Sequence, residues 1–171
     1  MKKAFNRAKV ATPLWESILS RDQDLTGIFN RLGTPVIIKP CVSGGSMGIG
    51  IKNVVKNEKE LKVQVEKMFD GYRGWNLSAD GVIAESFIAG REFTVFITGS
   101  YFNKDEAVIY MPVERVFHKS LPVNERFLSF DRLWEIYEDE TAMPNEENFY
   151  DYALPEQSII GYIKKLVGMH M

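Results

Sequence analysis

Short apolar runs, separated by clusters of turn-forming residues, dominate the first two thirds of the chain. A run of four to eight apolar and β-branched residues bounded by glycine or proline is typical of a buried strand. In the third run the apolar residues also alternate with polar ones, as on a strand with one buried face. The fourth run contains Pro112, which indicates a sheet edge or a bulge. The predicted strands are 36–39, 82–86, 92–98 and 107–116, and a fifth segment, 48–55, is predicted to return against the first.

Apolar positions spaced three and four apart predict helices between and around these strands. Asn57 is placed to begin a helix with Leu61, Val65, Met68 and Phe69 on one face. The other predicted helices are 2–9, 24–32 (with Asp24 as its cap and Gly33 closing it) and 156–167. Segment 117–152 loses regular periodicity, which is typical of a functional or mobile loop. The pattern predicts an α+β fold in which antiparallel hairpins are flanked by helices.

Composition narrows the class of protein. The chain has 171 residues, 45% of them hydrophobic, which suits one domain or two small lobes with an apolar core. Its formal net charge of −2 gives no electrostatic argument for a nucleic acid or an anionic membrane as partner. The single cysteine, Cys41, excludes an internal disulfide and suits a reducing cytosol. We expect a cytoplasmic protein, although the basic, acid-free residues 1–9 leave organelle targeting open.

The first candidate site is a lysine followed by a glycine-rich loop. Lys39 ends the first apolar run, and Gly44, Gly45, Ser46, Met47 and Gly48 follow after Pro40. A fixed positive charge beside flexible backbone N–H donors is suited to a polyphosphate. The loop is not a Walker loop, since no Gly-Lys-Ser/Thr follows, and it is not a kinase loop, where the lysine comes after the glycines. An ordinary glycine-rich hairpin turn remains the alternative.

The second candidate site is the segment 82–95. Glu85 lies near the end of one predicted strand, and Glu92 begins the next after a connector that holds Gly90. Two carboxylates at the ends of neighbouring strands can flank a ligand. The alternative is that both are solvated strand ends, with Arg91 and Glu92 forming a surface ion pair of little energetic value.

Taken together, these motifs resemble the ATP-grasp fold. They are Thr12-Pro13, Pro35-Val-Ile-Ile-Lys-Pro40, Gly44-Gly-Ser-Met-Gly48 and Glu85-Ser-Phe-Ile-Ala-Gly-Arg-Glu-Phe-Thr-Val95, and their order is most similar to that in D-alanine–D-alanine ligases. The resemblance extends from about Lys2 to Ser100, and more loosely to the end. It implies a small central lobe at 1–86 and a partial C-terminal lobe at 87–171. The family's lid would lie within 117–152, with 127–134 as its best match.

The resemblance also implies roles for individual residues. Lys39 would contact the ATP phosphates, and Ser46 with the N–H groups of 44–48 would close over the β- and γ-phosphates. Glu85, Ser86 and Ile88 would receive adenine largely through backbone groups, with apolar surface from Phe87 and Ile88. Glu92 would hold the ribose hydroxyls. The implied cofactors are ATP and Mg²⁺, and the implied substrate is a small, amino-acid-like molecule.

The implied reaction joins a carboxylate to an amine through an acyl phosphate, which needs a lid that excludes water. Three positions depart from the pattern of the peptide-forming ligases. Gly45 stands where they have a serine, and Leu133 and Trp134 stand where they have a lysine and a tyrosine. Arg132 is the candidate for the missing charge, although arginine and lysine differ in geometry. These departures argue against D-alanine as the substrate.

The two ends of the sequence suggest a truncated ligase. No segment matches the family's N-terminal domain, and no strands follow the last helix to carry the acidic and amide ligands of magnesium, so we expect no metal site and little activity from this chain alone. The acids of 135–147 are expected to form a solvated loop. One alternative is a non-catalytic ATP-grasp module for binding or regulation, with apolar surface that a second copy or a partner supplying the missing lobes would cover. Another is a related ligase with a different acid substrate.

Overall fold

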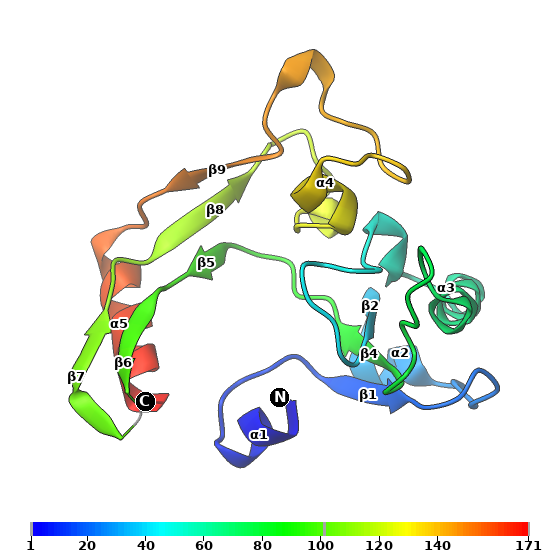
Figure 1. The fold of residues 1–171 in the computed structure, drawn as a ribbon, viewed down its shortest axis with the longest axis horizontal. Helices are drawn as coiled ribbons and strands as arrows, with labels where there is room; N and C mark the ends of the chain where they lie inside the picture. The colour runs from blue at the N-terminus through cyan, green and yellow to red at the C-terminus, as the bar shows by residue number, and fades with distance from the viewer. Residues whose placement is uncertain (1, 101, 171) are drawn as a thin grey trace. The chain divides into compact units, whose positions relative to one another are not determined.

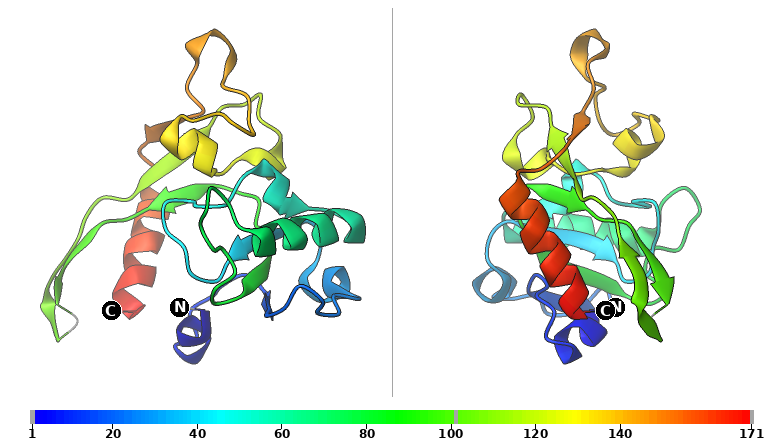
Figure 2. Two further views of the ribbon diagram at one scale, coloured as in Figure 1. Left: turned by 45° about the vertical axis from the view of Figure 1, so that its right-hand side comes forward. Right: turned by 90° about the vertical axis from the view of Figure 1, so that its left-hand side faces the viewer.

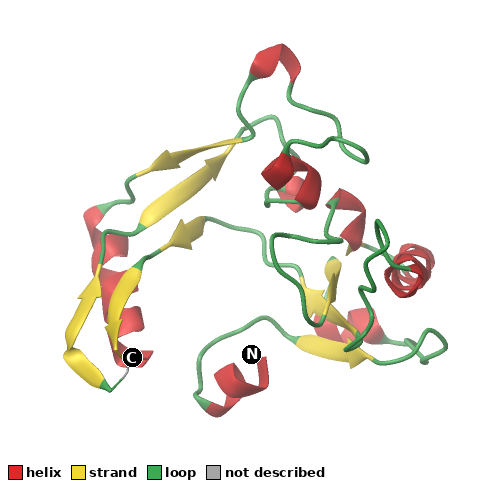
Figure 3. Cartoon of the chain, in the orientation of Figure 1, coloured by secondary structure: helices red, strands yellow, loops and turns green. Residues whose placement is uncertain are grey.

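The computed structural model describes residues 2–100 and 102–170 and divides the chain into two compact units (Figure 1). Unit 1 comprises the described residues of 1–12, 90–120 and 148–171, and unit 2 comprises 13–89 and 121–147. Both units combine helices with antiparallel strands, as the colouring of Figure 3 shows. This confirms the predicted α+β fold class.

Unit 2 is built on a four-stranded antiparallel sheet. The spatial order is β1-β4-β2-β3, so the two predicted strands 36–39 and 82–86 pair at its centre. β1 was not predicted, because its four residues show no clear apolar alternation. The strands are β1 (Trp15–Ile18), β2 (Val36–Pro40), β3 (Val54–Val55) and β4 (Val82–Ser86).

One face of this sheet packs against helices and forms the core of unit 2. Because side chains alternate along a strand, Val36 and Ile38 of β2 share this face with Val82 and Ala84 of β4, and all four are at most 1% exposed. Helix α3 (Glu58–Asp70) covers it with the apolar stripe that the sequence predicts, and Asn57 caps the helix by accepting a hydrogen bond from the Glu60 N–H.

Unit 1 contains two separate strand groups. Strand β8 lies between β5 and β9, and β6 pairs with β7 as a hairpin. Helix α5 contacts β7, and Figure 2 shows it running beside this hairpin. The elements are α1 (Lys2–Arg7), β5 (Glu92–Thr94), β6 (Ile97–Ser100), β7 (Asn103–Ile109), β8 (Val113–Phe117), β9 (Tyr150–Ala153) and α5 (Gln157–His170).

Three predicted strands are wrong in extent. Segment 92–98 is divided between β5 and β6, which pair with different partners, and segment 107–116 is divided between β7 and β8 just before Pro112, which has no N–H to donate to a ladder. In segment 48–55 only β3 is a strand. The 3-10 turn η1 (Ile51–Asn53) precedes it, because the buried Asn53 side chain donates to the carbonyls of Ile38 and Gly48 and so bends the chain.

The predicted helix at 24–32 is also too long. Helix α2 (Ile28–Leu32) is preceded by Gly27 in the left-handed region, and the Asp24 carboxylate accepts a hydrogen bond from Thr26 N–H in a turn instead of capping the helix. Gly33 closes the helix as predicted, donating to the Phe29 carbonyl. None of the helices within residues 2–100 and 102–170 has the length and apolar character needed to cross a membrane.

Segment 121–147 belongs to unit 2 and holds short helical elements. Helix α4 (Phe130–Trp134) is capped by the buried Ser129, whose side chain accepts from the Arg132 N–H. The turns η2 (Val123–Glu125) and η3 (Pro144–Glu146) lie on either side of it. The expectation that the acids of 135–147 are all solvated is wrong for Glu140, which is 6% exposed because it forms an ion pair with Arg132.

Candidate functional site

Lys39 and Glu85 lie together on the face of the unit 2 sheet that is opposite the core. Ile37 of β2 pairs with Glu85 of β4, and Lys39 is the next residue of β2 on the same face. The Lys39 Nζ lies 3.2 Å from Glu85 Oε2, and their side chains are 28% and 10% exposed. This face of the sheet therefore presents a partly open lysine that is held by a largely buried carboxylate.

The glycine loop that follows β2 is folded into two tight turns. Met47 N–H donates to the Gly44 carbonyl and Ile49 N–H to the Ser46 carbonyl. Gly45, Ser46 and Gly48 all have φ between 57° and 71°, the left-handed region that only glycine adopts at little cost. Within the part of the chain that the structure describes, no group accepts a hydrogen bond from the N–H of Gly45, Ser46 or Gly48. These N–H groups are therefore backbone donors that an anionic ligand could use.

Segment 121–147 is bonded directly to this loop, which the sequence did not predict. Ser46 Oγ donates to the Leu128 carbonyl (2.8 Å) and Trp134 Nε1 to the Gly45 carbonyl (2.9 Å). A Cβ atom at position 45 would lie 3.1 Å from the Trp134 ring. Two of the residues that depart from the ligase pattern, Gly45 and Trp134, are therefore in contact.

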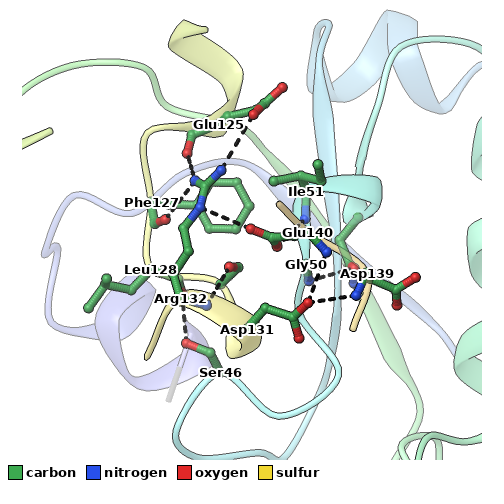
Figure 4. Close-up of polar contacts among 12 residues, drawn as sticks. Ser46, Gly50, Ile51, Glu125, Phe127, Leu128, Asp131, Arg132, Asp139 and Glu140 are labelled. Atoms are coloured by element: carbon green, nitrogen blue, oxygen red, sulfur yellow. Dashed lines mark hydrogen bonds and ion pairs between the residues drawn. The ribbon is translucent and has the colours of Figure 1, made fainter. Parts of the chain in front are cut away.

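Arg132 is buried inside segment 121–147 (Figure 4). Its side chain is 3% exposed, with Nε 2.9 Å from Glu140 Oε2 and further hydrogen bonds to the carbonyls of Glu125 and Phe127. The Glu140 carboxylate also accepts from the Ile51 N–H, which ties the segment to the chain after the glycine loop. Arg132 thus holds the shape of the segment, and its part in catalysis stays a prediction.

The predicted adenine segment, Glu85 to Ile88, leaves the end of β4. The N–H groups of Ser86 and Phe87 donate to the carbonyls of Leu14 and Pro35, and the Ser86 hydroxyl donates to the Leu32 carbonyl. The Ile88 N–H has no acceptor among the residues that the structure describes, and the Ile88 side chain is 67% exposed. Ile88 is therefore the position in this segment whose backbone donor and apolar surface are both open.

Glu92, predicted to bind ribose, lies in unit 1, whereas the other predicted site residues lie in unit 2. It sits on β5 directly opposite Arg115 of β8 and forms an ion pair with it. The Arg115 guanidinium is also 5.0 Å from the centre of the Tyr150 ring and donates to the Tyr152 hydroxyl. Sequence reasoning missed Arg115, because a cross-strand partner depends on a register that the sequence does not reveal.

The alternative reading, a surface ion pair between Arg91 and Glu92, is not what the structure shows. Arg91 instead donates to Glu114 on β8 and to Glu156 before α5. These hydrogen bonds hold the pKa of the Glu114 carboxyl, and that of Glu156, below the ordinary value. Arg91 immediately precedes β5 and Glu92 is its first residue, and the two side chains have different partners on β8.

Across residues 2–100 and 102–170, no three histidine, cysteine, aspartate or glutamate side chains come together where they could hold a metal ion. Four of the acids described above, Glu85, Glu92, Glu114 and Glu140, are instead paired with an arginine or a lysine. The described side chains alone therefore do not fit a complete magnesium site, which needs several oxygen ligands.

Comparison with known proteins finds similarity over most of the chain. Residues 6–146 match the family model described as the D-ala D-ala ligase C-terminus. The D-alanine–D-alanine ligase of Bordetella petrii is 35% identical over 99 residues, which are 58% of this chain and 27% of the relative. That of Borrelia duttonii is 33% identical over 99 residues (58% and 23%), and that of Phocaeicola vulgatus 30% over 89 residues (52% and 23%). The chain thus spans about a quarter of the length of these relatives.

Proposed function

Because this chain belongs to the family of D-alanine–D-alanine ligase C-terminal domains, we propose that it is the ATP-binding region of an ATP-dependent carboxylate–amine ligase. In that reaction a carboxylate oxygen attacks the γ-phosphorus of ATP and ADP leaves. An amine then attacks the acyl carbon, and phosphate leaves. The substrates of the whole enzyme are proposed to be small and amino-acid-like, in keeping with the names of the relatives.

The phosphate site is the best supported part of the proposal. Lys39 supplies the positive charge, and the loop supplies the three open N–H groups of Gly45, Ser46 and Gly48. A triphosphate would compete with Glu85 for the Lys39 ammonium, so the loss of that ion pair is subtracted from the gain of the charge-assisted contact with phosphate. The single observation that carries the function is this placement of a partly open lysine and a donor-rich loop at one end of β2.

Adenine and ribose are assigned to the segments after the phosphate site. Glu85, Ser86, Phe87 and Ile88 are proposed to receive adenine, with the open Ile88 N–H as donor to a ring nitrogen. Glu92 is proposed to accept hydrogen bonds from the ribose hydroxyls, since a carboxylate has about four acceptor positions and Arg115 uses part of them. Magnesium is expected for the family, but no step of this proposal is assigned to a metal bound by these residues alone.

The nucleotide site is tested by titrating the chain with Mg·ATP in a calorimeter. Lys39→Ala is expected to weaken ATP binding at least about tenfold, which corresponds to about 1.4 kcal/mol for one charge-assisted contact. Lys59→Ala, on the exposed side of α3, is the matched control and is expected to bind like the wild type. Equal affinities for wild type and Lys39→Ala would contradict the proposed phosphate site.

A second function is favoured by the contacts between the loop and segment 121–147. The Ser46 hydroxyl and the Gly45 carbonyl are held by Leu128 and Trp134, as in a loop kept for binding rather than for repeated opening and closing. An ADP-release assay with a panel of amino acids separates the two functions. Sustained release supports a ligase, whereas ATP binding without release supports a non-catalytic binding or regulatory module.

Arg115 is proposed to position Glu92 for the ribose. Arg115→Met is expected to weaken ATP binding roughly tenfold, because it removes the cation that holds the Glu92 carboxylate in position. The same substitution is expected to leave the affinity for 2′,3′-dideoxy-ATP unchanged, since that nucleotide lacks both hydroxyls. If both nucleotides lose affinity equally, Arg115 acts on the fold alone and the ribose assignment of Glu92 fails.

A further inference from the structure

Unit 2 contains a cavity of about 270 Å³, and among its lining residues only Gly48 also belongs to the proposed nucleotide site. Its walls are the chain at 48–53, helix α3 and the segment 130–140. Lys39 and Glu85 do not line it, because they lie on the sheet face opposite α3. A cavity of this size is at the small end of the range for ligand sites in proteins.

The first polar group in the wall is the side chain of Gln64. This residue lies on α3 between the core residues Leu61 and Val65 and is 5% exposed. Among the described residues, none forms a hydrogen bond with its amide. The Gln64 amide is not among the fully buried polar atoms without a partner, so a group that enters the cavity would replace water at this amide with a direct hydrogen bond.

The second polar group is the carboxylate of Asp131, which is 3% exposed. Its Oδ2 accepts from the N–H groups of Asp139 and Glu140, at 2.7 and 2.9 Å. Figure 4 shows these two bonds at one oxygen only, and no donor to Oδ1 is found in residues 2–100 and 102–170. Asp131 is thus a buried charge stabilised by two neutral donors, with one oxygen still open.

The other acids of the wall are each neutralised by a basic side chain. Asp70 pairs with Arg21, Asp139 with Lys52 and Glu140 with Arg132. Lys67 also lines the cavity, but its side chain is exposed, where water screens its charge. The negative charge of Asp131 is therefore the one that remains for a ligand inside the cavity, and it excludes phosphates and carboxylates as the group bound there.

From these groups we propose that the cavity binds a small organic ammonium compound that also carries a neutral amide. The ammonium would donate to Asp131 Oδ1, and the amide would exchange hydrogen bonds with Gln64. The apolar body of the ligand would lie against Met68, Leu77 and Phe130, which also line the cavity. A divalent metal fits less well, since one open carboxylate oxygen cannot complete its coordination.

The probe is leucinamide, which has an ammonium, an amide and an apolar body. Two analogues each remove one group: 4-methylpentanamide lacks the amine, and 3-methylbutan-1-amine lacks the amide. Binding is measured on the whole chain by ¹H–¹⁵N NMR titration at pH 6.5. We expect shifts at residues 48–53 and 64–71, and an affinity for leucinamide at least about tenfold higher than for either analogue.

Two substitutions test whether Asp131 and Gln64 cause the preference for leucinamide over its two analogues. Asp131→Asn keeps an oxygen that can accept from Asp139 and Glu140 but removes the charge, and it is expected to bind leucinamide and 4-methylpentanamide alike. Gln64→Met keeps the volume but removes the amide, and it is expected to bind leucinamide and 3-methylbutan-1-amine alike. Lys59→Ala, on the exposed side of α3 and outside the cavity, is expected to bind leucinamide like the wild type.

The proposal is overturned in either of two ways. The wild-type chain could show no leucinamide-dependent shifts around the cavity, or it could bind all three probes equally. In both cases the Asp131 carboxylate and the Gln64 amide do not select a ligand that carries an ammonium and an amide. This comparison needs only the wild-type protein, so it decides the matter even if a substituted chain does not fold. A failure of ATP binding would leave this result unaffected, because the two sites share no charged side chain.

Discussion

Replacing Arg132 by alanine is expected to lower the free energy of unfolding by about 3–5 kcal/mol, as for other buried ion pairs that lose one partner. The reason is Glu140, whose side chain is 1% exposed and would keep a buried charge without its cation. The carbonyls of Glu125 and Phe127 would lose a donor as well. Urea denaturation followed by tryptophan fluorescence measures the effect, since Trp134 lies in the same helix.

Two further variants show whether the loss of stability comes from the Glu140 carboxylate that is left without its cation. Lys52→Ala breaks an exposed pair with Asp139 in the same region and is expected to cost less than about 1 kcal/mol. The double substitution Arg132→Met with Glu140→Leu removes both charges and is expected to be more stable than Arg132→Ala by at least about 2 kcal/mol. If the free energy of unfolding of Arg132→Ala lies within about 1 kcal/mol of the wild-type value, the ion pair of Arg132 with Glu140 does not hold segment 121–147 in place.

Local patterns predicted the parts of the fold whose stability is also local. The stripe of Leu61, Val65 and Met68 and the cap at Asn57 determine α3 within one stretch of chain. Strands β2 and β4 are buried at the centre of the sheet, so their continuous apolar runs were diagnostic. The half-exposed strands β1 and β9 have weaker patterns and were not predicted.

The partners of charged residues could not be predicted, because they depend on register and on distant segments. Arg91 and Glu92 are neighbours in sequence, but β5 and β8 pair so that Glu92 faces Arg115 and Arg91 reaches Glu114. The buried pair of Arg132 and Glu140 was hidden in an acidic stretch that reads as solvated. A sequence of acids shows the charges present, whereas burial depends on what packs over them.

The proposed nucleotide site also has a part that the sequence predicts and a part that only the structure shows. Lys39 and the glycine loop were found from sequence because they are contiguous and their chemistry depends on the backbone. The contact of Gly45 with Trp134 joins residues 89 positions apart and was visible only in the structure. In the sequence, these two positions are separate departures from the ligase pattern. Their contact gives one physical reason for both changes, since a side chain at 45 would crowd the indole.

Replacing Gly48 by alanine is expected to lower the free energy of unfolding by about 2–4 kcal/mol, the sum of a left-handed backbone cost and overpacking. Gly48 has φ of 71°, and a Cβ atom there would clash with Leu77 Cδ1. Leu77 is 4% exposed and belongs to the core, so it cannot turn away into solvent. Thermal unfolding without ATP measures the loss of stability. The shift in unfolding temperature on adding ATP measures whether the loop still binds the nucleotide.

Gly44→Ala is the matched control for this prediction. Gly44 lies in the same loop, has no positive φ, and a Cβ atom there would have nothing within 4 Å, so a change below about 0.5 kcal/mol is expected. The double substitution Gly48→Ala with Leu77→Ala removes the clash but keeps the backbone strain. If its cost equals the sum of the two single costs, the Leu77 contact does not explain why position 48 is glycine, and the left-handed backbone alone does.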